Sequence, residues 1–277
     1  MSSAAILGNR TVIALEGADA RDFLQGLITN DIGECAPGRA IYAALLTPQG
    51  KILFDFFIAA VNSGYWLDCA SSSAGELARR LGFYRLRAKV GITVKSEFAV
   101  AAVWRTDDFP AVDGGAVFPD PRLAELGART IGPRQQIESA VAAMAPDDYD
   151  SFRLKLGVPD SNDLPPDQVF ALDAGLEELH GVSFTKGCYV GQEVTSRMKH
   201  RATARRRFYI AEADGLPPPG SVIEADGREL GRISSAKGGR GLALVRVDRV
   251  AEAENKQERL LAGGRPVALH RPDWLHA

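Results

Sequence analysis

The spacing of apolar residues near the N-terminus changes from one that is typical of a strand to one that is typical of a helix. Residues 11–17, TVIALEG, read as a strand. A helix then begins near Asp19, and one of its faces carries four apolar side chains, those of Phe23, Leu24, Leu27 and Ile28. The pattern therefore predicts a strand followed by an amphipathic helix.

The next segments read as strands and a second helix. Residues 41–61, IYAALLTPQGKILFDFFIAAV, contain two apolar runs joined by TPQGK, which is a hairpin signal. Residues 64–70, GYWLDCA, form another strand, and residues 73–94 predict a helix followed by a strand. Helices and strands that alternate with hairpins predict an α+β fold rather than a doubly wound parallel sheet.

From residue 105 onward, the chain is predicted to contain loops and helices first and then a β-rich segment. Residues 105–146 are rich in Gly, Pro, Asp and Ala and predict loops, an edge strand and a short helix. Residues 146–160 predict a helix that Asp147 or Asp148 caps and GVP ends. After LPPPG (216–220), which has the composition of a stiff linker, a hairpin at ADG and further short strands predict a small closed β-module.

Composition narrows the class of protein. The chain has 277 residues, of which 45% are hydrophobic and 25% charged, with a net charge of -2; this suits a globular protein of two or three modules. The N-terminus has no basic region ahead of its apolar residues, so it does not read as a secretory signal. The most apolar stretch, residues 52–61, is too short to cross a membrane. We therefore expect a cytoplasmic protein with no membrane partner.

Positive charge is concentrated in one run. Between Val194 and Ile210 there are six basic residues and no acidic one: Arg197, Lys199, Arg201, Arg205, Arg206 and Arg207. Because the whole chain has a net charge of -2, the remainder is clearly acidic. Such a basic patch suits an anion, for which phosphate, a polycarboxylate tail and RNA are all candidates. The alternative is an ordinary solvated surface.

The cysteines argue against a metal centre held by this chain alone. Cys35, Cys69 and Cys188 are far apart, and no Cys/His cluster has the spacing of zinc ligands. Iron–sulfur clusters usually take about four cysteines, and a disulfide framework is not expected either. If metal chemistry matters here, the metal belongs to a partner.

One cysteine lies in a distinctive setting, FTKGCYVGQE (184–193). A helix is predicted to begin near Gly191, which places Cys188 close to a helix N-terminus, with Lys186 two residues before it. Both features favour the thiolate, the reactive form of cysteine. A tight turn in which Cys188 is a small buried apolar residue is the alternative, and the residues alone do not separate the two.

Asp55 interrupts an apolar strand. One face of that strand would carry Ile52, Phe54 and Phe56, and the other Leu53, Asp55 and Phe57. Since the second face is not polar as a whole, a carboxylate there must be paired, solvated or held for a ligand. We expect Asp55 to point into a cleft.

Several motifs resemble one known family. FTKGCYVGQE is similar to the signature of the YgfZ-type folate-binding proteins, relatives of the glycine-cleavage T-protein, an aminomethyltransferase. FLQGLITNDI, PQGKILFDFF, FYRLRAKVGI, DPRLAELGAR and FRLKLGVPD are similar to further segments of that family, so the resemblance covers most of the chain. The form KGCYxGQE, with its cysteine, distinguishes the YgfZ branch from the T-protein.

The resemblance implies a fold and a role. The fold would be three modules arranged as a ring, with tetrahydrofolate or a one-carbon derivative in the central cavity. The modules would be residues 1–45 with 146–210, residues 46–145, and a β-barrel of residues 211–277. The role would be that of an accessory protein in the assembly or repair of iron–sulfur clusters. Its partners would be reduced folate and iron–sulfur client or assembly proteins.

The resemblance also implies site residues. Cys188 would be a reactive thiol or a transient cluster ligand, with Lys186 supporting its thiolate. The residues expected to bind folate are Asp55, Asp173, Tyr189, Gln192, Glu193 and Arg201. The basic run would hold the glutamate tail of the folate.

Two departures from the family keep alternatives open. The T-protein relatives carry two adjacent aspartates where this chain has Phe54-Asp55, which argues against aminomethyl transfer. The segment FALDAGLEELHGVSF lacks the usual proline and asparagine, and Asp173 is the candidate for the polar role. A folate-dependent one-carbon transferase and an RNA-binding module using residues 197–207 remain as alternatives. Few aromatic residues adjoin the basic run, so nucleic acid is not expected.

Overall fold

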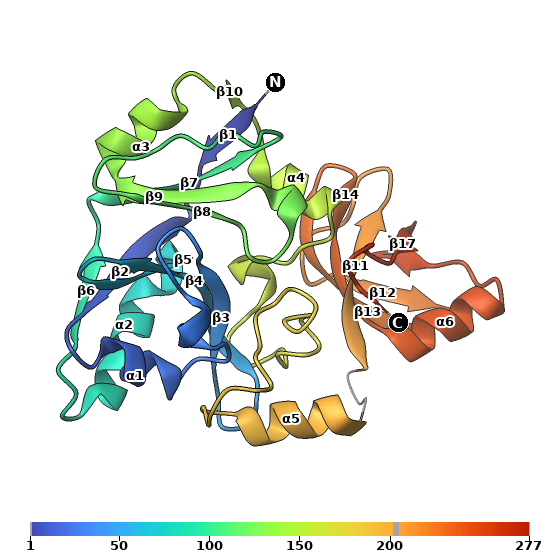
Figure 1. The fold of residues 1–277 in the computed structure, drawn as a ribbon. Coiled ribbons are helices and arrows are strands. Elements are labelled where there is room, and N and C mark those ends of the chain that lie inside the picture. The colour runs from blue at the N-terminus through green and yellow to red at the C-terminus, as the bar shows by residue number, and fades with distance from the viewer. Residues whose placement is uncertain (1, 202–204, 277) are drawn as a thin grey trace.

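Three β-sheets and six α-helices are seen in the structure, a computed structural model that describes residues 2–201 and 205–276 (Figure 1). Two sheets are formed by residues 3–146 and the third by residues 206–270. The long connection between α4 and α5 runs between the N-terminal sheets and the C-terminal one (Figure 1).

The first sheet is antiparallel, with strand order β3–β4–β5–β2–β6. Its strands are β2 (Arg10–Glu16), β3 (Ile41–Leu46), β4 (Ile52–Val61), β5 (Gly64–Ala70) and β6 (Gly91–Lys95). Helices α1 (Ala20–Gln25) and α2 (Ala74–Arg85) cover one face, where Leu24 and Leu77 join the core. Because the other face is also covered, the apolar runs of β2 and β3 are buried throughout.

The second sheet has the strand order β10–β1–β7–β9–β8. Its strands are β1 (Ser3–Ile6), β7 (Phe98–Trp104), β8 (Ala116–Pro119), β9 (Ala128–Pro133) and β10 (Ala145–Pro146). Helix α3 (Arg134–Val141) packs on it through Ile137. The expected edge strand is β8, whereas β9 lies inside the sheet, between β7 and β8.

Helix α4 (Tyr149–Lys155) begins at one of the two predicted caps, because the Asp148 carboxylate accepts a hydrogen bond from the Ser151 amide at 3.3 Å. The chain then forms loops as far as α5 (Gln192–Arg201), which starts where the sequence predicted. Short 3₁₀ turns occur at Ile32–Glu34, Ser71–Ser73, Ala124–Leu126 and Ser161–Asp163.

The C-terminal sheet curves into a nearly closed β-barrel with the strand order β16–β15–β12–β13–β14–β11–β17. Its strands are β11 (Arg206–Glu212), β12 (Val222–Ala225), β13 (Arg228–Lys237), β14 (Arg240–Arg246), β15 (Leu261–Ala262), β16 (Arg265–Pro266) and β17 (Ala268–His270). Helix α6 (Val247–Asn255) packs on it. The predicted hairpin joins β12 to β13, with Asp226 and Gly227 at φ of 47° and 71°.

The α+β class, the hairpin of β3 and β4, and the C-terminal barrel are thus confirmed. LPPPG connects β11 to β12, which are two strands of the barrel sheet. It is therefore not a linker between modules. The boundaries drawn at residues 46 and 211 fall within β3 and β11. The division into three modules remains a prediction.

Candidate functional site

The cysteine motif packs against the turn between β3 and β4. At Gly191, where φ is 84°, an added Cβ would lie 2.6 Å from the carbonyl oxygen of Thr47. At Gly50 in the turn, with φ of 80°, an added Cβ would lie 3.1 Å from the Cβ of Val194. The two glycines therefore permit a backbone approach that a larger residue would block. This contact fixes the start of α5 against the first sheet.

Lys186 holds the motif to the loop that follows α1. Its Nζ donates to the carbonyl oxygens of Gln25 at 2.7 Å, Ile28 at 2.6 Å and Asn30 at 3.0 Å. Burial lowers the pKa of the Lys186 ammonium to about 8, and Asp31 opposes that effect. All three ammonium hydrogens are engaged by the backbone. Lys186 thus anchors the loop, and its expected support of the Cys188 thiolate stays a prediction.

The three cysteines differ in exposure. Cys188 is exposed, Cys35 is half-buried and Cys69 is buried. Burial raises the pKa of the Cys35 thiol to about 11 and that of Cys69 to about 12. The alternative of a buried packing role for Cys188 is therefore wrong. Within residues 2–201 and 205–276, no group of three or more His, Cys, Asp or Glu side chains could hold a metal ion.

Asp55 points to the interior of the molecule. It is 4% exposed, and its carboxylate accepts a hydrogen bond from the Tyr42 hydroxyl at 3.1 Å. Burial raises the pKa of Asp55, while the nearby positive charge of Arg10 counteracts this. Asp55 thus lies at the margin of a group of buried charges.

That group joins the two N-terminal sheets. Arg10 pairs with Asp68 at 2.6 Å, and Arg129 of the second sheet pairs with the same carboxylate at 2.8 Å. Further buried pairs are Arg129–Asp120 at 3.2 Å, Arg122–Asp120 at 2.8 Å and Arg10–Asp160 at 3.2 Å. The Arg129 guanidinium also lies 3.8 Å from the ring centre of Phe57. Each charge has a partner, which is the arrangement expected of a structural ion cluster.

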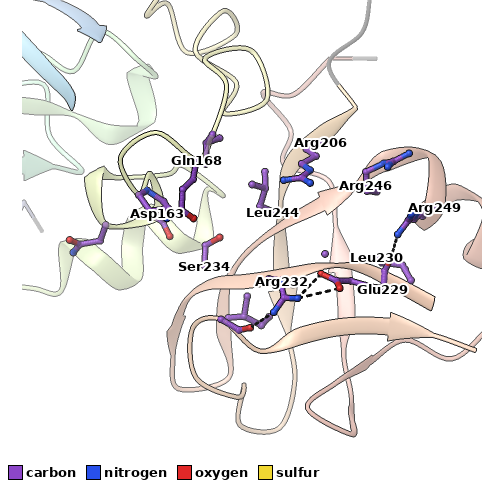
Figure 2. Close-up of a pocket in the computed structure, with 16 residues that line it drawn as sticks. Asp163, Gln168, Arg206, Glu229, Leu230, Arg232, Ser234, Leu244, Arg246 and Arg249 are labelled. Atoms are coloured by element: carbon purple, nitrogen blue, oxygen red, sulfur yellow. Dashed lines mark hydrogen bonds and ion pairs between the residues drawn. The ribbon is translucent and has the colours of Figure 1, made fainter. Parts of the chain in front are cut away.

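A cavity of about 590 Å³ lies between the loop of residues 162–169 and the barrel (Figure 2). Four arginines line it: Arg206, Arg232, Arg246 and Arg249. The acidic residues that line it are Asp163 and Glu229, and Figure 2 shows Asp163 and Gln168 on the loop side, across from the arginines. Val169, Leu230, Ile233 and Leu244 add apolar wall. The cavity therefore suits a ligand with an apolar part and negative charge.

The residues expected to bind folate lie in several places. Asp55 is beside the ion cluster, Tyr189 of the cysteine loop is buried in the core, and the Asp173 carboxylate accepts from the Arg206 amide at 3.4 Å. Gln192 and Glu193 start α5, and Arg201 ends it. None of these six residues lines the cavity, although Arg206 of the basic run does.

The basic run is not one continuous patch. Lys199 pairs with Glu177, and Arg207 with Glu178 at 3.7 Å. Arg197 approaches Glu193 at 4.0 Å. These partners lie outside the run, or just before it, and reduce the positive surface that an RNA strand would need. Sequence reasoning missed Arg232, Arg246 and Arg249, which come from β13, β14 and α6 and carry no common spacing.

Comparison with known proteins gives consistent relatives. The GCVT N-terminal domain family matches residues 9–104, and the CAF17 C-terminal beta-barrel domain family matches residues 205–277. The mitochondrial iron-sulfur cluster assembly factor IBA57 of Homo sapiens is 32% identical, covering 97% of this chain and 84% of that protein. Its counterpart in Mus musculus is 31% identical with the same coverage.

A solved structure shares the fold. The glycine cleavage system aminomethyltransferase T from Bartonella henselae superposes with a TM-score of 0.78 over 99% of this chain and 86% of that one. At 16% identity this likeness shows the fold alone. The expectation of a cytoplasmic protein is contradicted, because the IBA57 relatives are named as mitochondrial.

Proposed function

Because the chain belongs to the IBA57 family of iron–sulfur cluster assembly factors, we propose that it takes part in assembling or repairing iron–sulfur clusters of client enzymes. Its partners would be iron–sulfur client or assembly proteins. The YgfZ-type character suggested by KGCYVGQE, and the binding of reduced folate, are the finer parts of this proposal.

The observation that carries the proposal is the exposed Cys188 on a firmly held loop. Lys186 fixes the loop from beneath, and Gly191 fixes it against the β3–β4 turn. A thiol held at the surface can bind, as its thiolate, a cluster that a partner presents. Since no metal-binding group is formed by the described residues, the partner would supply the remaining ligands of the cluster.

Tetrahydrofolate fits the cavity beside the barrel. The volume of this cavity, about 590 Å³, is in the range of small-molecule sites. Arg232 pairs with Glu229 at 3.0 Å and Arg246 with Asp248 at 2.6 Å, so Arg206 and Arg249 supply the positive charge that matches the carboxylates of a glutamate tail. Leu230 and Leu244 offer apolar contact for the flat rings.

In this proposal, different side chains of the cavity contact different parts of the folate. Arg206 and Arg249 would bind the tail carboxylates, and the Gln168 amide would donate and accept hydrogen bonds with the ring system. Bound tetrahydrofolate would supply a carrier for a one-carbon unit. Asp55 lies apart from this wall, in contact with Tyr42, and is a poor candidate for contact with the ligand.

A one-carbon transferase remains the second candidate, because the T-protein of Bartonella henselae shares the fold. Formation of methylene-tetrahydrofolate from an aminomethyl donor would support it. We expect no turnover, since Phe54 replaces one of the two adjacent acids and Asp55 is buried beside an ion cluster.

Cys188→Ser tests the proposed function directly. The variant is expressed in cells that lack the protein, and the activity of a [4Fe–4S]-dependent enzyme is measured together with the amount of soluble variant. We expect Cys188→Ser to accumulate normally but not to restore the activity. Cys35→Ser, the matched control, should restore it. Full restoration by Cys188→Ser would reject a role for the thiol.

A further inference from the structure

The C-terminal end of α2 exposes large apolar side chains. Phe83 is 60% exposed, Tyr84 36% and Leu86 89%. Only two other large apolar residues of the described chain are comparably exposed, Ile6 and Val94, and Val94 lies on β6, which follows α2. We call residues 83–89 the α2 tip. A concentration of exposed apolar groups at one place on a surface is a mark of an interaction site.

The backbone at the α2 tip is strained. Leu86 has φ of 44° and ψ of -106°, a conformation that a residue with a Cβ rarely adopts. Its side chain is almost wholly in solvent, so burial in the free protein does not offset the strain. The fold thus holds a leucine outward in a conformation that would suit a glycine better.

Positive charge surrounds these apolar groups. Residues 77–96 contain six basic residues and no acidic one: Arg79, Arg80, Arg85, Arg87, Lys89 and Lys95. Two carboxylates come from outside this range: Glu76 pairs with Arg79 at 2.5 Å, and Asp19 accepts from the Lys89 amide at 2.7 Å. Arg85 and Arg87 are exposed on either side of Leu86 in the sequence. The α2 tip therefore complements a negatively charged surface.

The α2 tip is at an outer extremity of the first sheet, on the side away from the barrel (Figure 1). None of the described helices is long and apolar enough to cross a membrane. A projecting apolar point flanked by cations suits a lipid surface, because headgroups and acyl chains deform around it, whereas a protein partner would need a matching groove.

We propose that the α2 tip is a peripheral membrane-binding surface that selects anionic lipid. Phe83, Tyr84 and Leu86 enter the boundary between headgroups and acyl chains, and Arg85 and Arg87 bind the lipid phosphates. The expectation of no membrane partner rested on the short apolar stretch of residues 52–61 and on the net charge of -2, and neither of these addresses a local surface such as the α2 tip. This inference does not depend on cluster assembly, and Cys188→Ser should leave lipid binding unchanged.

The test is co-sedimentation of the full chain with extruded vesicles. One preparation is phosphatidylcholine alone, and the other has one third of its lipid replaced by phosphatidylglycerol. The wild-type protein should sediment with the anionic vesicles and remain in solution with the neutral ones. Arg85→Glu combined with Arg87→Glu should reduce the bound fraction at least tenfold, whereas Arg259→Glu, at an exposed position on the barrel module, should not.

Leu86→Gly separates binding from folding. Glycine relieves the strain at φ of 44°, so the unfolding temperature should be unchanged or higher while the bound fraction falls several-fold. Failure of the wild-type protein to bind anionic vesicles would overturn the proposal and make an acidic protein the occupant of the α2 tip. An equal loss in Arg259→Glu, or full binding by Leu86→Gly, would also overturn it.

Discussion

The Nζ atom of Lys186 lies 2.6 Å from the carbonyl oxygen of Ile28, although the two residues are 158 positions apart in the chain. The same ammonium group also binds the carbonyls of Gln25 and Asn30. This contact ties the cysteine loop to the segment after α1. The surface position of Cys188 is thus set by contacts that Lys186, a residue of the same loop, makes with a segment far away in the chain.

Lys186→Met should destabilise the protein. The thioether fills much of the same space but leaves three carbonyl oxygens without their donor, which should lower the free energy of unfolding by about 3 kcal/mol. Urea unfolding followed by tryptophan fluorescence measures this change. Lys256→Met, which removes an exposed ammonium paired with Glu252, should cost less than about 1 kcal/mol. Similar losses in the two variants would contradict the anchoring role.

Asp68→Ala should have a large effect on stability. It removes the carboxylate shared by Arg10 and Arg129 and leaves two buried guanidinium groups short of a partner. The expected loss is about 3–5 kcal/mol, measured by urea unfolding. Asp248→Ala removes an exposed partner of Arg246 and should cost less than about 1 kcal/mol. A small loss in Asp68→Ala would mean that water reaches the ion cluster.

Arg206→Gln should weaken the binding of tetrahydrofolate. A charge-assisted hydrogen bond contributes about 1.5–3 kcal/mol, so Kd should rise about 10- to 100-fold. Isothermal titration under reducing, anaerobic conditions measures the affinity. Arg259→Gln is a charge-matched control, since Arg259 is exposed and does not line the cavity. If both variants bound as tightly as the wild-type protein, folate would have to bind elsewhere.

Acid should weaken the junction between α4 and the barrel. Burial alone would raise the pKa of Asp148, but hydrogen bonds from Lys237 and Ser151 lower it to about 2. A carboxyl group whose pKa is lower in the folded state stabilises the fold above its unfolded pKa, and this stabilisation is lost as pH falls through the folded value. Both side chains are partly exposed, so solvent limits the contribution to about 1 kcal/mol.

Asp148→Asn provides the comparison. At pH 6 its free energy of unfolding should be about 1 kcal/mol below that of the wild-type protein, and the difference should shrink as pH falls from about 4 to 2. Urea unfolding at several pH values measures this difference. A gap that stayed constant with pH would show that the Asp148 charge contributes nothing.

Local features of the fold could be predicted from the sequence because neighbouring residues determine them. The cap of α4 at Asp148 and the turn at Asp226-Gly227 depend on backbone groups only a few residues away. The hairpin of β3 and β4 follows from two apolar runs and a short polar turn. These predictions are confirmed.

The environment of the candidate site could not be predicted in the same way. The sequence placed Lys186 beside Cys188, yet its partners follow α1, far away in the chain. The cavity arginines Arg232 and Arg246 come from different strands, and only the closing of the barrel brings them to one wall. Such contacts depend on tertiary packing, which apolar periodicity and motif spacing do not specify.

The three thiols should react with an alkylating reagent at very different rates in the native protein. The thiolate is the reactive form, and burial raises the pKa of Cys35 to about 11 and that of Cys69 to about 12. Cys188 is exposed and should be modified first by iodoacetamide at pH 8, while Cys69 should react only after unfolding in urea. Mass spectrometry of tryptic peptides over time gives the three rates, with the urea-unfolded chain as the control in which they converge. Native rates that were alike would contradict the exposure of Cys188, and with it the thiol's proposed part in cluster assembly.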